Sequence, residues 1–178
     1  VVRGDFEAAN AILPEIPPSE HSAVARFLES QGFKEEALAV SSDPEHKFDL
    51  AVQLSKLDVA TQILKESFSG ADGDVGDVQH KWKQIGDLAL SAGQYSLVEE
   101  AALQAGDLSG LLLLHSSSGN ADGIAKLADE AIAQRRNNVA FISYLLLGRV
   151  EECIELLIKS GRLPEAAFFA RTYMPSQV

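Results

Sequence analysis

The residues best suited to chemistry in this chain are three aspartates in a glycine-rich segment, Asp72, Asp74 and Asp77. An EF-hand calcium loop needs oxygen ligands at alternating positions, a glycine at position 6 and a bidentate glutamate at position 12. Counted from Asp72, position 6 is Asp77 and position 12 is Lys83, so a cation stands in place of the closing ligand. We therefore interpret residues 69–77 as a mobile acidic loop and predict no metal site there.

The same segment spaces three glycines, Gly70, Gly73 and Gly76, in a way that resembles a phosphate-binding turn. Such turns follow a strand, open a helix and point backbone amides at the anion. No strand is predicted before this segment, and its aspartates would repel a phosphate. The spacing therefore predicts no nucleotide cofactor.

None of the histidines has a second histidine at the spacing of a zinc motif. They are His21, His46, His80 and His115, spread over four predicted helices. We interpret all of them as surface or partly buried polar residues.

The single cysteine, Cys153, excludes an internal disulfide and a cysteine-rich zinc site. It occupies an apolar helical position, where a buried thiol acts as a small hydrophobic group. The pairs Glu99–Glu100 and Glu151–Glu152 are adjacent in sequence, so their side chains diverge by about 100° on a helix and cannot form one acid–base pair. The sequence thus predicts no catalytic, cofactor-binding or metal-binding residue.

The only aromatic cluster with basic neighbours is His80-Lys81-Trp82-Lys83. Tryptophan is a frequent anchor of protein interfaces. We favour the simpler interpretation, in which Trp82 packs between two helices of its own chain.

The elements that would position these residues all read as short amphipathic helices, because apolar residues recur at i, i+3 and i+4 and no segment alternates like a strand. Asp43 followed by Pro44 predicts one helix start, since aspartate caps and proline suits the first turn. The predicted helices cover residues 5–13, 18–31, 34–41, 44–54, 58–68, 78–92, 94–105, 107–117, 121–135, 138–147, 149–160 and 164–173.

Six glycines follow apolar helical stretches, where a left-handed C-terminal cap favours glycine. The fifth residue after each is small or apolar, and Ser55 begins a seventh copy of this pattern without glycine. The six glycines are Gly32, Gly93, Gly106, Gly119, Gly148 and Gly161. Several lie 13 residues apart, about one short helix plus a tight turn.

Repeated helix–turn–helix units with small residues at helix contacts indicate an all-α fold, an α-solenoid of short, tetratricopeptide-like helical hairpins with irregular repeats. A strict 34-residue tetratricopeptide period does not emerge. We predict a single α-solenoid segment over residues 1–178, within a longer protein.

The composition limits the partners. With 15 Lys and Arg against 26 Asp and Glu, the formal net charge is −11, so the chain repels nucleic acid and anionic membranes. The longest apolar run, residues 111–114, is far shorter than the ~20 residues of a membrane span. We therefore expect no nucleic acid partner, no direct membrane insertion and a cytosolic protein.

Several runs of the chain resemble the coatomer β-prime family. They are residues 43–51 (DPEHKFDLA), 81–84 (KWKQ), 110–114 (GLLLL), 118–121 (SGNA) and, most specifically, 161–178 (GRLPEAAFFARTYMPSQV). The resemblance departs at residues 69–78 and at Ser55, where the family tends to have glycine.

The resemblance implies a non-enzymatic scaffold segment of the COPI vesicle coat, which acts in Golgi-to-ER and intra-Golgi transport. It implies assembly with the coatomer α subunit and other coatomer subunits, no small-molecule substrate, and a cytoplasmic position, peripheral on Golgi membranes and COPI-coated vesicles. Recognition of dilysine cargo belongs to propeller domains of the family, so no cargo-binding residue follows from it.

Two other classes of protein stay open at this point. A stand-alone tetratricopeptide-like adaptor would bind peptides in a basic or asparagine-lined concave groove. A helical hydrolase or metal enzyme would need clustered ligands that the spacing does not supply.

Overall fold

The computed structural model describes residue 17, residues 20–67 and residues 75–175. The predicted helix at 5–13 lies outside the described residues, as do Asp72 and Asp74 with most of the predicted acidic loop.

The described residues form helices joined by short connections, without a strand among them. The helices are α2 (His21–Ser30), α3 (Lys34–Val40), α4 (Pro44–Gln53), α5 (Leu57–Ser67), α6 (Val75–Ser91), α7 (Tyr95–Ala105), α8 (Leu108–Ser118), α9 (Ala121–Ala133), α10 (Asn137–Leu146), α11 (Val150–Lys159) and α12 (Leu163–Tyr173). The prediction of an all-α solenoid is confirmed.

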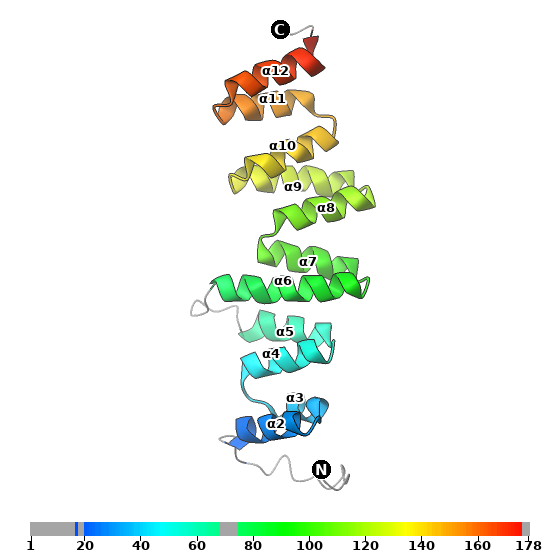
Figure 1. Cartoon of the computed structure of the whole chain (residues 1–178), viewed down its shortest axis with the longest axis vertical. Coiled ribbons are helices and arrows are strands. Elements are labelled where there is room, and N and C mark those ends of the chain that lie inside the picture. The colour runs from blue at the N-terminus through cyan, green and yellow to red at the C-terminus, as the bar shows by residue number, and fades with distance from the viewer. Residues whose placement is uncertain (1–16, 18–19, 68–74, 176–178) are drawn as a thin grey trace. The chain divides into compact units, whose positions relative to one another are not determined.

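The chain divides into two compact units, Val1–Ala101 and Ala102–Val178, and each is described by itself. The first contains α2 to α6 and most of α7; the second contains the end of α7 and α8 to α12 (Figure 1). In the first unit the consecutive helices from α2 to α6 pack against each other, and in the second unit those from α8 to α12 do so. The predicted single segment over 1–178 stays a prediction.

One type of corner joins most consecutive helices. A residue with positive φ ends one helix, and the next residue's amide donates to the carbonyl five positions before it, at 2.7–2.9 Å. This is the 6→1 bond of the Schellman motif, which satisfies a carbonyl that the helix end leaves free. Within the described residues the corner residues are Gly32, Ser55, Gly93, Gly106, Gly119, Arg135, Gly148 and Gly161.

The six predicted glycine caps and the glycine-free copy at Ser55 are therefore confirmed, with φ of 55° at Ser55. The corner at Arg135, with φ of 57°, was not predicted. It ends α9 at Ala133, two residues before the predicted end at 135, because a left-handed residue cannot continue the helix.

The fifth residue after each corner lies in the helix interface, as the sequence pattern predicts. Val98 is half-buried and the others are buried. The complete set is Ala37, Ala60, Val98, Leu111, Ile124, Ala140, Cys153 and Ala166. A small or apolar residue at this position lets the helix after the corner lie close to its neighbour.

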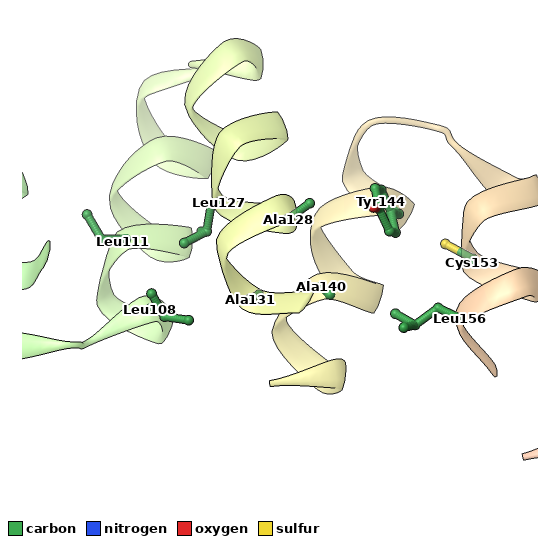
Figure 2. Packing of buried hydrophobic residues seen from close by; sticks show 9 residues of the cluster. All are labelled: Leu108, Leu111, Leu127, Ala128, Ala131, Ala140, Tyr144, Cys153 and Leu156. Atoms are coloured by element: carbon green, nitrogen blue, oxygen red, sulfur yellow. The ribbon is translucent and has the colours of Figure 1, made fainter. Parts of the chain in front are cut away.

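The core of the second unit is a continuous apolar layer through α8 to α11 (Figure 2). Leu108 and Leu111 of α8 face Leu127 of α9. Tyr144 of α10 belongs to the same cluster as Cys153 of α11. The alanines of α9 and α10 between them are fully buried, which brings those two helices together.

The core of the first unit includes a cluster of Leu28, Ala37 and Leu50, which joins α2, α3 and α4. Phe48 of α4 and Trp82 of α6 are also buried. The preferred interpretation of Trp82, as a residue packed within its own chain, is confirmed.

Helix α6 begins at Val75, three residues before the predicted start at 78. The reason is Asp77, which was assigned to the loop. An acidic residue in the first turn is favourable beside the positive end of the helix dipole, and Asp77 also pairs with Lys81 one turn later.

Candidate functional site

The first polar cluster begins at the amino end of α4. Asp43 is extended, and its Oδ1 accepts a hydrogen bond from the amide of Glu45 at 3.1 Å, while Pro44 occupies the first turn. The predicted cap is therefore present. It fixes the direction in which the next side chain, His46, leaves the helix.

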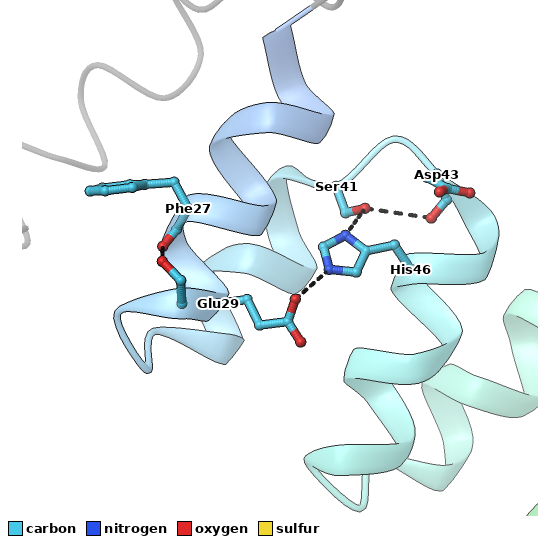
Figure 3. A network of polar contacts seen from close by, with 6 residues as sticks. Phe27, Glu29, Ser41, Asp43 and His46 are labelled. Atoms are coloured by element: carbon cyan, nitrogen blue, oxygen red, sulfur yellow. Dashed lines mark hydrogen bonds and ion pairs between the residues drawn. The ribbon is translucent and has the colours of Figure 1, made fainter.

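His46 connects three segments of the first unit through both ring nitrogens (Figure 3). Its Nε2 lies 2.9 Å from Glu29 Oε2 on α2, and its Nδ1 lies 3.2 Å from Ser41 Oγ in the connection before α4. A neutral ring that donates from Nε2 to Glu29 and accepts from Ser41 satisfies both contacts. The hydrogen bond from His46 is the largest cause that lowers the pKa of the Glu29 carboxyl.

The order serine, histidine, glutamate is also that of a hydrolytic triad. Ser41, however, is only 2% exposed, and its Oγ also lies 3.4 Å from the carbonyl of Asp43. A nucleophile must reach a substrate carbonyl, and a buried hydroxyl cannot. The geometry favours a structural link between α2 and α4.

The second polar cluster ties α4 to α6. Lys81 is 7% exposed, its Nζ lies 2.8 Å from Glu45 Oε1, and it also pairs with Asp77. The same Nζ lies 6.0 Å from the ring centroid of Phe48, within reach of a cation–π attraction.

Burial by itself would lower the pKa of Lys81, because desolvation penalises the ammonium. The hydrogen bonds to Asp77 and Glu45 outweigh that cost and hold the pKa above its usual value. Lys81 is therefore charged, and its two partners offset the cost of burying it.

The remaining histidines occupy different environments. His80 is exposed on α6, His21 is half-buried on α2, and His115 is buried at 6% exposure near the end of α8. The interpretation of the histidines as surface or partly buried residues was therefore wrong for His115. A Cβ atom added at Gly123 would lie 2.7 Å from His115 Nδ1, so the histidine fills the contact between α8 and α9.

Cys153 is fully buried, and burial raises the pKa of its thiol. Its Sγ lies 3.6 Å from the carbonyl of Phe141. The interpretation of Cys153 as a buried thiol is confirmed. Of the adjacent glutamates, Glu100 pairs with Lys65 of α5, and Glu151 and Glu152 lie in the first turn of α11.

Across the described ranges, no three His, Cys, Asp or Glu side chains come together in a way that could hold a metal ion. In the same ranges no helix has the length and apolar character that crossing a membrane requires. The absence of catalytic, cofactor and metal residues stays a prediction.

Two open hollows lie on the surface of the described part. One, of about 440 Å³, lies between α5 and α7 and has Asp58, Glu66, Lys65 and Glu100 on its walls. The other, of about 340 Å³, is apolar and is formed by α10, α11 and α12. Neither one resembles a basic peptide groove.

The comparison with known proteins covers the whole chain. Residues 1–178 match the family model of the COPA/B TPR domain. The chain belongs to this family. Over 178 residues it is 52% identical to coatomer subunit beta'-2 of Oryza sativa subsp. japonica, 51% to coatomer subunit beta'-3 of Arabidopsis thaliana and 52% to coatomer subunit beta' of Homo sapiens. Each alignment covers 100% of this chain and 19% of the relative, so the chain spans about a fifth of their length.

Two of the sequence runs that resemble the coatomer β-prime family meet in this COPA/B TPR domain. The run at residues 43–51 supplies Glu45, His46 and Phe48, and the run at residues 81–84 supplies the lysine that contacts the first and last of them. Sequence reasoning missed this pairing. The sequence signal for this pairing was the run DPEHKF, in which charged and polar residues lie next to a phenylalanine. Polar groups carried into a buried contact need partners.

Proposed function

We propose that this chain is a structural scaffold segment of the COPI vesicle coat and mediates assembly of coat subunits in Golgi-to-ER and intra-Golgi transport. Its partners are the coatomer α subunit and other coatomer subunits. It works in the cytoplasm, peripheral on Golgi membranes and COPI-coated vesicles as part of the coat.

The observation that carries the proposal is the match over the full chain to proteins named as coatomer subunits, at 51–53% identity. The helix-and-corner construction supports it. Packed helical repeats present long surfaces to partners and need no catalytic cleft.

The chain acts without catalysis, cofactor or small-molecule substrate. This view is supported by the burial of Ser41 and by the engagement of Lys81 in structural contacts. The net charge of −11 disfavours nucleic acid and anionic lipid, so membrane attachment comes from other coat components.

A stand-alone peptide-binding adaptor is the alternative function. The groove between α5 and α7 carries more carboxylates than cations, which disfavours a peptide held by its carboxylate end. No observation favours the adaptor over the scaffold.

The test is a pull-down with the purified α-subunit solenoid, run beside anionic liposomes and a dilysine cargo peptide. We expect binding to the α subunit only. Binding to liposomes or peptide without binding to the α subunit would contradict the proposed function.

A further inference from the structure

Ser42 lies in the short connection between α3 and α4, outside either helix, and its side chain is exposed. Asp43 follows it directly, and Glu45 stands three positions after it. No other serine or threonine of the sequence has an acidic residue at both of these positions. Acid-directed serine kinases select their substrates by such a charge pattern, because basic residues of the kinase bind the carboxylates that follow the serine.

The residues around Ser42 have structural roles that it does not share. Ser41 is 2% exposed, and its Oγ contacts the ring of His46 and the carbonyl of Asp43 (Figure 3). Asp43 caps α4, so the helix needs no hydroxyl from Ser42. The Oγ of Ser42 lies 3.3 Å from Ser22 Oγ of α2 in an exposed contact, which water can replace. The structure therefore shields one of two adjacent serines and presents the other to an enzyme.

The contact with Ser22 places Ser42 beside one flank of α2. At about 100° per residue, Ser22, Arg26 and Glu29 lie within roughly 60° of one another on that flank. The flank faces the amino end of α4, since Glu29 contacts His46 there. Arg26 is exposed and lies one helical turn from Ser22, so its side chain is within reach of a phosphate on Ser42.

The groups on this flank suit a phosphate. The guanidinium of Arg26 can donate two parallel hydrogen bonds to phosphate oxygens, and the hydroxyl of Ser22 can donate another. Helix α2 has no acidic residue in its first turn, and its N-cap Glu20 makes no side-chain cap hydrogen bond. The positive end of the helix dipole therefore adds to the attraction for an anion beside Ser22.

Two carboxylates next to Ser42 in the sequence oppose a phosphate. Asp43 is engaged with the backbone at the start of α4, and Glu45 lies 2.8 Å from the ammonium of Lys81, which offsets its charge. The repulsion is weakened by these contacts, whereas Arg26 and the amino end of α2 attract the phosphate directly.

We propose that Ser42 is a phosphorylation site for an acid-directed serine kinase, and that its phosphate ties the connection before α4 to α2 through Ser22 and Arg26. In the transfer, the hydroxyl oxygen of Ser42 attacks the γ-phosphorus of a nucleoside triphosphate, the bond from that phosphorus to the bridging oxygen breaks, and the nucleoside diphosphate leaves. The hydroxyl proton passes to the catalytic base of the kinase. The inference is independent of the proposed function and adds a modification site to the first unit.

The first test is incubation of the 178-residue chain with ATP, magnesium and an acid-directed serine kinase, followed by mass spectrometry that locates each phosphate. Matched controls within the chain are Ser55 and Ser96, which are exposed and have an acidic residue at the third position only. We expect Ser42 to be modified about tenfold faster than either control, and Ser41 to stay unmodified. A synthetic peptide of residues 38–50 measures modification of the same sequence outside the fold.

The second test is the change in melting temperature that kinase treatment causes, compared between wild type and Ser42→Ala so that modification elsewhere cancels. We expect the phosphate on Ser42 to raise the melting temperature by about 1–3 °C, because the anion is favourable beside Arg26 and the amino end of α2. Arg26→Gln, a change at an exposed position, should lose about half of that rise or more. Circular dichroism before treatment establishes that each variant is folded.

Modification of the peptide without modification of Ser42 in the folded chain would overturn the inference. Failure of both, with the kinase active on an unrelated acidic substrate, would overturn it as well. A phosphate on Ser42 that leaves the melting temperature unchanged or lower, or that raises it equally in Arg26→Gln, would overturn the tie to α2. None of these outcomes bears on binding of the chain to coat subunits, so the proposed function stands or falls separately.

Discussion

At the scale of single residues, Lys81 shows how a charge can be buried in a small helical interface. Its two carboxylate partners are about half exposed or more, with side-chain exposures of 63% for Glu45 and 48% for Asp77. If Lys81 is replaced, the two carboxylates can be solvated by water. If the carboxylates are replaced, the buried lysine cannot. The stability of the contact between α4 and α6 therefore depends on Lys81.

We predict that Lys81→Met lowers the free energy of unfolding by about 1–2 kcal/mol, through loss of charge-assisted hydrogen bonds between α4 and α6. Urea denaturation followed by circular dichroism measures it. Lys83→Met on the exposed side of the same helix is the control, with a change below about 0.5 kcal/mol. Equal effects of the two substitutions would contradict the role of the cluster.

The link between Glu29 and His46 gives a second prediction, on pH. The hydrogen bond from His46 lowers the pKa of Glu29, so the contribution of this carboxylate to stability is full above its unfolded-state pKa and is lost as pH falls through the lower folded-state pKa. Glu29→Gln should therefore reduce the unfolding free energy at pH 7 by roughly 0.5–1 kcal/mol, since the pair is partly exposed.

The difference in unfolding free energy between wild type and Glu29→Gln should shrink below pH 4.5, because the wild-type carboxylate is then protonated and loses the same charge. Urea titrations at neutral and acidic pH measure this, with Glu151→Gln on α11 as a control for removal of one negative charge. A difference that grows on acidification would show that Glu29 is not stabilised as the carboxylate.

At the scale of elements, the recurring corner sets the length and direction of the helices. Its central residue needs positive φ, which glycine adopts without strain and other residues adopt at a cost of about 1 kcal/mol. Gly148 and Arg135 occupy equivalent corners on either side of α10, with φ of 70° and 57°. No atom lies within 4 Å of a Cβ placed on Gly148, so conformation alone decides a substitution there.

We predict opposite effects at these corners. Gly148→Ala should lower the unfolding free energy by about 1 kcal/mol, and Arg135→Gly should raise it by up to about 0.5–1 kcal/mol, because strain is added in one case and removed in the other. Thermal and urea unfolding measure both. A stabilising Gly148→Ala would mean that the corner tolerates a side chain without strain.

The corners also show how far sequence can take the prediction of this fold. Glycine after an apolar helix is a local signal, and it located six corners; Ser55 was found from the apolar residue five positions later. Arg135 also has a buried small residue, Ala140, five positions later. Arginine, however, does not indicate a positive φ in the way glycine does, so this corner was missed. The contacts of Lys81 and His46 span 36 and 17 residues, and depend on how helices pack rather than on spacing within one helix.

At the scale of the whole molecule, the dominant property is the excess of acidic residues, 26 against 15 basic ones. Like charges repel more strongly in the compact state than in the extended one. Exposed ion pairs such as Lys56–Glu35, Lys159–Glu155 and Arg162–Glu165 remove only part of this repulsion.

We predict that salt stabilises the chain. Raising NaCl from about 10 mM to about 300 mM should raise the melting temperature by roughly 1–3 °C, because the Debye length falls and net repulsion is screened. Differential scanning fluorimetry measures it. A fall in melting temperature would mean that ion pairs outweigh the net repulsion.

The packing of successive helices has a consequence for synthesis. Among the described helices, those in contact are neighbours in sequence or lie one helix apart, as α8 and α10 do. Contacts of such short sequence separation close small loops, so folding is fast and can begin wherever two helices are available. Each helix emerging from the ribosome finds its packing partner already made, and the chain can fold progressively during translation without waiting for its carboxyl end.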